Sequence, residues 1–180
     1  FNSPRKGKVG VKGQVANQTD KERKVRVQAV MTDPKGVDPA GETVPLTIPP
    51  HSTGEVDIPL VLSNVKPWSP DNPDLYTLSV EVWDAAGGDH SKDPAHLLDN
   101  RSIRVGVRTV EITEKGLVLN GSLFPEKLIG GNRHQDFARL GNAVPNNLQW
   151  QDAVKLRKAG MRVIRSAHYP QDPAFMDACD

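Results

Sequence analysis

Two clusters of polar residues, each directly behind a short apolar run, carry the side chains that could do chemistry. The run 161–164 leads into Arg165, His168 and Tyr169, and the run 127–131 leads into Asn132-Arg133-His134-Gln135-Asp136. A buried parallel strand stays apolar while it crosses a core. An abrupt change to Arg, His and Tyr therefore marks the point where the backbone emerges at a surface that handles a polar ligand.

The residue types in the two clusters suit recognition of hydroxyl and carboxylate groups. Arg133 and Arg165 can each hold a carboxylate through two parallel hydrogen bonds, whether that carboxylate is catalytic or belongs to a substrate. His134 and His168 can donate to or accept from hydroxyls, as sugar recognition requires. A structural interpretation stays open, in which Arg165 pairs with an internal acid and His168 lies at a strand end. Because parallel strands present their carboxyl ends at one edge, the two clusters predict one shared surface.

Metal and cofactor motifs are not found. The five histidines do not form a paired ligand spacing, so we expect no metal site. Gly130-Gly131 lacks the remaining glycines of a dinucleotide or phosphate loop, so we expect no cofactor and interpret this pair as a close backbone approach at a strand end. Cys179 is the single cysteine, which excludes an intrachain disulfide, and we expect it in a core rather than as a nucleophile.

Charge and hydropathy exclude two classes of partner. The formal net charge is +1, with 23 Lys and Arg against 22 Asp and Glu, so there is no long-range field for a nucleic acid. No stretch approaches the roughly 20 apolar residues of a membrane span, and we expect no signal peptide within the chain. The compartment stays open. The N-x-[ST] sites at Asn17, Asn100 and Asn120 are interpreted as surface turns.

The segment 1–110 predicts an antiparallel β-sandwich, because short runs alternate apolar and polar residues. The apolar members are Val25, Val27, Ala29, Met31; Val44, Leu46, Ile48; Val56, Ile58, Leu60; Tyr76, Leu78, Val80, Val82; and Ile103, Val105, Val107. About seven such strands without helical periodicity are expected of an immunoglobulin-like sandwich. Pro45 and Pro59 remove ladder donors, which predicts edge strands or bulges there. The residues from Asp84 to Asp89 are expected to form a loop.

The segment 111–180 predicts a hairpin followed by two βα units. Asn120-Gly121 accepts the positive φ angles of a tight hairpin. Strand 127–131 then leads to a helix that starts at Asn146 or Asn147 and stops at Gly160.

The next predicted strand is 161–164, and Asp172-Pro173 can cap and begin another helix. Strand, helix, strand, helix is the order of a parallel sheet with right-handed crossovers. Because a closed barrel needs eight strands, the segment is predicted to be the incomplete opening of a (β/α)8 barrel.

These motifs resemble glycoside hydrolase family 2, the group that contains β-galactosidases, β-glucuronidases and β-mannosidases. The segment 165–170, followed after four residues by Phe175-Met176, is similar to a signature segment of that family. Similar segments also occur at Trp68-Ser69-Pro70, Asn72-Pro73, Leu75-Tyr76, Gly106-Val107-Arg108, Leu119-Asn120-Gly121 and Gly131-Asn132-Arg133-His134-Gln135-Asp136. The order of parts matches the family's central immunoglobulin-like domain followed by the start of its catalytic TIM barrel.

The resemblance implies a retaining exo-β-glycosidase that acts on a β-linked glycoside, with two catalytic glutamates roughly 5–5.5 Å apart. In the family both lie on later barrel strands, so neither catalytic residue is expected in this chain, and the chain alone is predicted to be inactive. The resemblance implies that His168 binds the sugar of the −1 subsite and that Arg165 holds the nucleophilic glutamate. Asn132, Arg133 and His134 match the loop that shapes the same substrate-binding pocket.

Gln135 stands where the family usually has Glu, so any charge-dependent role of that acid is lost. Asp136-Phe137-Ala138 stands where the β-galactosidases have His-His-Pro, which leaves the sugar open. The alternative interpretation is a non-catalytic immunoglobulin-like module that binds carbohydrate or protein. Under both interpretations, the apolar side chains of Leu128-Ile129 and Val163-Ile164 require another surface that buries them. The segment after Gly121 is therefore expected to pack on the sandwich, to self-associate or to be mobile.

Overall fold

The computed structural model describes residues 6–37, 39–85 and 94–180. The chain forms two compact units, Phe1–Thr109 and Val110–Asp180. The first unit is a β-sandwich and the second combines a small hairpin sheet with a parallel βαβα arrangement. The fold is therefore mainly β, as the sequence predicted.

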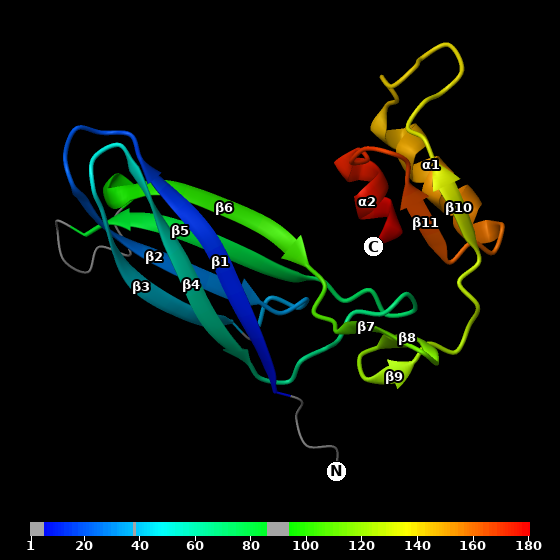
Figure 1. Cartoon of the computed structure of the whole chain (residues 1–180), viewed down its shortest axis with the longest axis horizontal. Helices are drawn as coiled ribbons and strands as arrows, with labels where there is room; N and C mark the ends of the chain where they lie inside the picture. The colour runs from blue at the N-terminus through cyan, green and yellow to red at the C-terminus, as the bar shows by residue number, and fades with distance from the viewer. Residues whose placement is uncertain (1–5, 38, 86–93) are drawn as a thin grey trace. The chain divides into compact units, whose positions relative to one another are not determined.

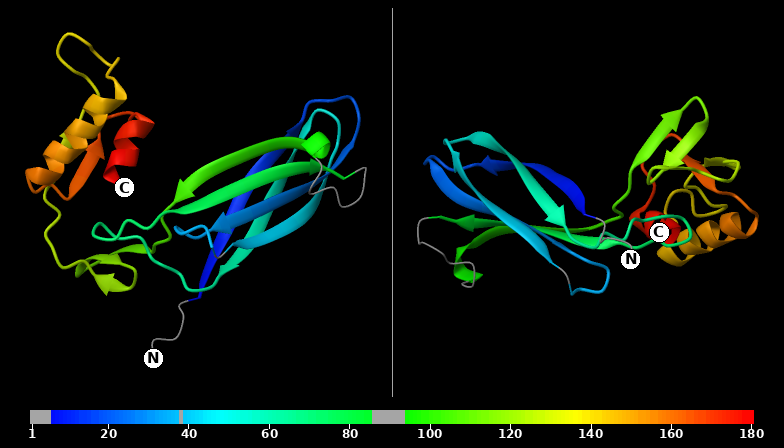
Figure 2. Two further views of the ribbon diagram at one scale, coloured as in Figure 1. Left: turned by 180° about the vertical axis from the view of Figure 1, so that it is seen from behind. Right: turned by 90° about the horizontal axis from the view of Figure 1, so that it is seen from below.

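The sandwich consists of two antiparallel sheets. One sheet pairs β1 (Gly7–Asn17) with β4 (Ser52–Leu62). The other sheet has the order β3, β2, β5, β6, with the bounds Ala40–Ile48, Arg23–Thr32, Tyr76–Asp84 and Leu97–Val105. A single 3-10 turn, Pro94–His96, precedes β6. In Figures 1 and 2 the two-stranded sheet lies across one face of the four-stranded sheet.

The core lies between these sheets and is built by the predicted alternation. Val27, Ala29 and Met31 of β2 are fully buried, and they face Ile58 and the other buried residues of β4. The intervening residues of β2 are partly exposed. Pro45 lies on β3, an outer strand of its sheet, and Pro59 lies on β4, which has only one hydrogen-bonded neighbour. The predicted edge positions of both prolines are thus confirmed.

The strand count and one predicted face differ from expectation. The described part of the sandwich has six strands rather than about seven. Ile103 was expected on a buried face, but it is 56% exposed. The reason is that β6 is the outer strand of the four-stranded sheet and the opposing sheet has only two strands, too few to cover it. Most of the loop predicted after Asp84 falls on residues 86–93, outside the described residues.

Asn17 is not a surface turn, contrary to the sequence interpretation. Its side chain is 5% exposed, and its Nδ2 donates to the carbonyl oxygens of Lys21, Ile48 and Pro49 at 2.8, 3.1 and 3.0 Å. Its Oδ1 accepts from the backbone N–H and the hydroxyl of Thr19. The amide thus joins the β1–β2 turn to the end of β3. The other two sites differ: Asn100 is exposed within β6, and Asn120 lies in a turn.

Tyr76, at the start of β5, fixes the approach to that strand. The side chain is buried and its hydroxyl accepts the backbone N–H of Lys66 at 3.0 Å. A tyrosine at this strand start that bonds the upstream backbone is a hallmark of immunoglobulin-like sandwiches. Tyr76→Phe leaves that N–H without its partner, and we expect a loss of about 2 kcal/mol in the free energy of unfolding. Urea denaturation followed by hydrogen exchange at Lys66 checks this, and an unchanged midpoint would refute it.

Trp68 packs against the segment Gly106-Val107-Arg108 at the end of the sandwich. Its backbone N–H donates to the carbonyl of Val107 at 2.9 Å, and the guanidinium of Arg108 lies 4.9 Å from its ring centroid. A Cβ at Gly106 would come within 2.8 Å of the Trp68 ring, so glycine is required for the close approach. Two of the segments that resemble the family, at Trp68 and at Gly106-Val107-Arg108, therefore pack on each other.

The second unit begins with a three-stranded sheet of β7 (Val110–Thr113), β8 (Gly116–Leu119) and β9 (Ser122–Leu123). Asn120 and Gly121 connect β8 to β9 with φ angles of 53° and 79°. Both angles are positive, as a tight two-residue hairpin requires. The predicted hairpin is confirmed.

The remaining elements are β10 (Gly130–Arg133), α1 (Asn146–Lys158), β11 (Val163–Ser166) and α2 (Pro173–Cys179). β10 and β11 pair in parallel, which confirms the βαβ prediction. Both strands begin later than predicted from their apolar runs, since pairing starts at Gly130 and Val163. A Cβ on Gly130 would lie 1.7 Å from the carbonyl oxygen of Val163, so glycine is what lets the backbones approach there. The first polar residues of the two clusters, Asn132 and Arg165, therefore lie within β10 and β11 rather than after them.

Two of the three predicted helix ends agree with the structure. Gly160 follows α1 with a φ of 83°, and Asp172 accepts the Ala174 N–H at 2.8 Å at the start of α2. The predicted asparagine cap of α1 is wrong, because Pro145 holds the N-cap position without a side-chain bond.

Cys179 was expected in a core but is exposed. Desolvation of the thiol, and then the Asp180 carboxylate, raise the pKa of Cys179, which disfavours the thiolate.

Candidate functional site

The register of the parallel strands brings the two polar clusters together. Asn132 is opposite Arg165, and Arg133 is opposite Ser166. Side chains alternate between the faces of a sheet, so Asn132 and Arg165 share one face and Arg133 points to the other. Asn132 and Arg165 are both exposed. Asn132 and Arg165 therefore lie together on an exposed face of this strand pair.

The two histidines lie beside each other at the carboxyl ends of these strands. The ring centroids of His134 and His168 are 5.8 Å apart in an edge-to-face arrangement, and Tyr169 lies 6.2 Å from His134. Nη2 of Arg165 is 3.2 Å from Nδ1 of His168. Arg165, His134 and His168 are all exposed. With Asn132 they form a contiguous rim, called the His134–His168 rim below.

Arg133 is placed differently from the other four candidates. Its side chain is 7% exposed, and its guanidinium donates to Gln149 at 2.7 Å and to Asp152 at 2.9 Å. It also donates to Gln171 and lies 3.9 Å over the ring of Phe175. The guanidinium thus faces α1 and α2, on the side opposite to the exposed rim.

A second set of contacts joins the loops that follow the two strands. The backbone N–H of Gln135 donates to the Tyr169 hydroxyl at 2.7 Å, and the side-chain oxygen of Gln135 accepts the backbone N–H of Asp172. Sequence reasoning missed Gln149, Asp152 and Gln171 as partners of Arg133. The one available signal was a pair of polar residues, Gln149 and Asp152, three apart on the otherwise packed face of α1.

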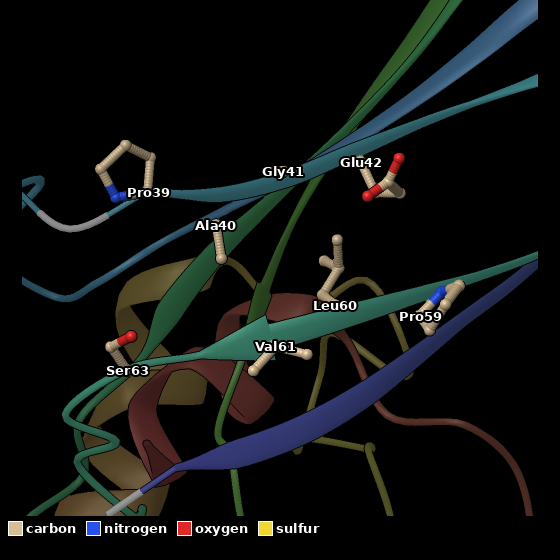
Figure 3. A pocket seen from close by; sticks show the side chains of 8 residues that line it. All are labelled: Pro39, Ala40, Gly41, Glu42, Pro59, Leu60, Val61 and Ser63. Atoms are coloured by element: carbon tan, nitrogen blue, oxygen red, sulfur yellow. The ribbon is translucent and has the colours of Figure 1, made fainter. Parts of the chain in front are cut away.

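Metal, membrane and cavity features do not point to another site in the described residues. They hold no group of three or more His, Cys, Asp or Glu side chains arranged to bind a metal. No helix among them combines the length and the apolar character of a transmembrane segment. A hollow of about 250 Å³ lies between β3 and β4, where Ala40 and Leu60 project into it (Figure 3). Glu42 is its single charged lining residue and no aromatic ring lines it, so it lacks a platform for a sugar.

Family comparison covers both units. The profile of glycosyl hydrolases family 2 matches residues 1–108, and the profile of the TIM barrel domain of glycosyl hydrolases family 2 matches residues 110–180. The fold is thus a β-sandwich followed by the first strands and helices of a parallel barrel. The chain belongs to glycosyl hydrolases family 2.

Curated relatives carry two activity names. A β-galactosidase of Thermoanaerobacter pseudethanolicus is 38% identical over 121 residues, which are 66% of this chain and 15% of that protein. A putative β-glucuronidase of Formosa agariphila is 31% identical over 157 residues, which are 87% of this chain and 17% of that protein. The chain thus spans about a sixth of the length of these relatives.

Solved structures show the same fold. A family 2 member from Bacteroides cellulosilyticus superposes with a TM-score of 0.84 at 26% identity, covering 98% of this chain and 23% of that chain. A β-glucuronidase of Bacteroides uniformis superposes with a TM-score of 0.81 at 23% identity, covering 99% of this chain and 20% of that chain. The sandwich and the barrel opening therefore both occur in the family.

Proposed function

We propose that this chain is part of a retaining exo-β-glycosidase, to which it supplies the spacer sandwich and one side of the −1 subsite. The observation that carries the proposal is the exposed His134–His168 rim on two paired parallel strands of a family 2 chain. Ligands of such folds bind at the carboxyl ends of the strands, where this rim lies. The glutamate acid/base and the glutamate nucleophile come from barrel strands after Asp180.

The contact between Arg165 and His168 supports a defined role for each side chain. Arginine carries only hydrogen-bond donors, so Nδ1 of His168 must accept in the 3.2 Å contact. The neutral imidazole then carries its proton on Nε2, which donates to a sugar hydroxyl. The remaining donors of Arg165 hold the carboxylate of the nucleophile. This donor orients the sugar for cleavage, and hydrogen bonds to the sugar hydroxyls that strengthen in the transition state lower the barrier to glycosidic cleavage.

His134 and Asn132 complete the proposed rim. The imidazole of His134 lies edge-on to His168 and can reach hydroxyls of the same sugar, and Asn132 offers both a donor and an acceptor. The substrate class is a β-linked glycoside, with the galactosides and glucuronides named for the curated relatives as the first candidates.

Exposed apolar residues support the proposal that further barrel strands cover this unit. Leu128 and Ile129 directly before β10 and Val163 at the start of β11 are all exposed. Strands of a parallel barrel are normally buried on both faces, so these residues require a neighbour. In the isolated chain the same residues form a surface through which two copies can associate.

The 180-residue chain alone is expected to hydrolyse none of nitrophenyl β-galactoside, β-glucuronide and β-mannoside, because the catalytic glutamates lie outside it. Turnover above the background of buffer would refute their placement. A chimera tests the rim directly: residues 110–180 replace the structurally equivalent segment of the Bacteroides uniformis β-glucuronidase, and hydrolysis of nitrophenyl β-glucuronide is measured.

In this chimera His168→Ala is expected to lower kcat roughly 100-fold or more, because it removes a donor that acts in the transition state. Lys158→Ala, at the exposed end of α1, is the matched control and should leave kcat unchanged. A folded, active chimera in which His168→Ala and Lys158→Ala behave alike would contradict the proposed role of the rim.

A further inference from the structure

We propose that Arg133 is a positioning residue, which fixes the distance between the imidazoles of His134 and His168 without touching the substrate. The inference rests on the proposed function only in that these imidazoles are taken to bind the sugar. The geometry itself is independent of the activity.

Arg133 holds the loop of His168 at both ends. Its backbone carbonyl accepts the N–H of Ala167, the residue before His168, at 3.0 Å. Its guanidinium donates to the side chain of Gln171, three residues after His168. The 168–170 loop is thus fastened to one residue of β10 on both sides, and that residue is the direct neighbour of His134.

The same guanidinium anchors the arrangement on the helices. Its Nη2 donates to Gln149 and Asp152 of α1, and its plane lies over Phe175 of α2. Three acceptors in fixed directions match the planar fork of an arginine, whereas a lysine ammonium offers no comparable fixed geometry. A buried charge that loses its partner is strongly destabilising, so these contacts hold the guanidinium firmly in place.

A direct substrate contact does not fit this placement. Asn132 and His134 flank Arg133 in sequence, and the alternation of side chains along β10 turns them to the opposite face. A sugar at the His134–His168 rim therefore meets His134 and Asn132, whereas the 7% exposed Arg133 lies behind the strand.

The test uses the 180-residue chain and measures magnetisation transfer between the ring protons of His134 and His168 by NMR. We expect a clear cross-peak in the unmodified chain, because the centroids are 5.8 Å apart edge-to-face. Arg133→Met keeps the apolar stem and removes every guanidinium contact, so the cross-peak should disappear. Arg162→Met is the matched control, since it removes an exposed ion pair with Glu126 and should leave the cross-peak intact.

If Arg133→Met prevents the second unit from folding, Gln171→Ala tests the positioning role of Arg133 instead. It removes one fastening of the loop and leaves the contacts of Arg133 with Gln149 and Asp152. We expect the cross-peak to weaken at least twofold while the amide signals of α1 stay in place. Cross-peaks of full intensity in every variant that folds would overturn the inference.

Activity in the chimera separates this inference from the proposed function. In an active chimera, Gln171→Ala should lower kcat roughly 10- to 100-fold through misplacement of His168, with a smaller change in KM. If the unmodified chimera is inactive but Arg133→Met or Gln171→Ala still weakens the ring cross-peak, Arg133 remains a positioning residue while the glycosidase assignment fails. An unchanged kcat together with an unchanged ring contact would leave the glycosidase assignment intact and refute the role of Arg133.

Discussion

Gly130→Ala is expected to separate β10 from β11 and to cost roughly 3 kcal/mol in local stability. The added Cβ would lie 1.7 Å from the carbonyl oxygen of Val163 and 2.6 Å from its Cγ1. The nearest atom belongs to the backbone, so relief requires a shift of a whole strand rather than a rotation of a side chain. That shift would break the bonds from the Arg162 and Val163 N–H groups to the Ile129 carbonyl.

Hydrogen exchange at the amides of Arg162, Val163 and Ala167 measures the effect, because these three donate across the strand pair. Their exchange should accelerate roughly 100-fold in Gly130→Ala, the equivalent of about 3 kcal/mol. Gly131→Ala is the matched control: no atom lies within 4 Å of the position of its Cβ, so exchange should change little. Equal exchange rates in the two variants would show that the close approach at Gly130 is not needed.

The sandwich was predictable because one physical rule governs it. Alternation with a period of two places Val27, Ala29 and Met31 on one face whatever the neighbouring strand is. The hairpin at Asn120-Gly121 and the cap at Asp172 were predictable because each depends on two or three adjacent residues. Burial of Ile103 was not predictable, because it depends on how many strands the opposing sheet has.

The strand ends that carry the candidate site were predictable, but the direction of the side chains was not. Apolar runs followed by polar clusters indicated two strand ends, yet pairing begins only at Gly130, where backbone contact rather than hydropathy decides. Arg133 and Arg165 look alike in the sequence. The register turns Arg133 to the helices and Arg165 to the open face, and the partners of Arg133 lie 16, 19 and 38 residues away.

Asn17 shows how a local motif misleads when the partners are distant. The Asn-Gln-Thr triplet indicated an exposed turn. Within it, the backbone N–H and the hydroxyl of Thr19 do donate locally to Oδ1 of Asn17. The acceptors at Ile48 and Pro49 are 31 and 32 residues away in sequence and come together only when β3 lies beside β2.

Asn17→Ala is expected to lower the free energy of unfolding of the sandwich by about 3 kcal/mol. It removes the donor for three carbonyl groups and the acceptor for Thr19, and buried polar groups without partners cost roughly 1–3 kcal/mol each, with water replacing some of the bonds. Urea denaturation monitored by fluorescence of the buried Trp83 measures the loss, and Asn100→Ala on the exposed β6 is the matched control. A loss below about 1 kcal/mol for Asn17→Ala would mean that the two turns are held by backbone pairing alone.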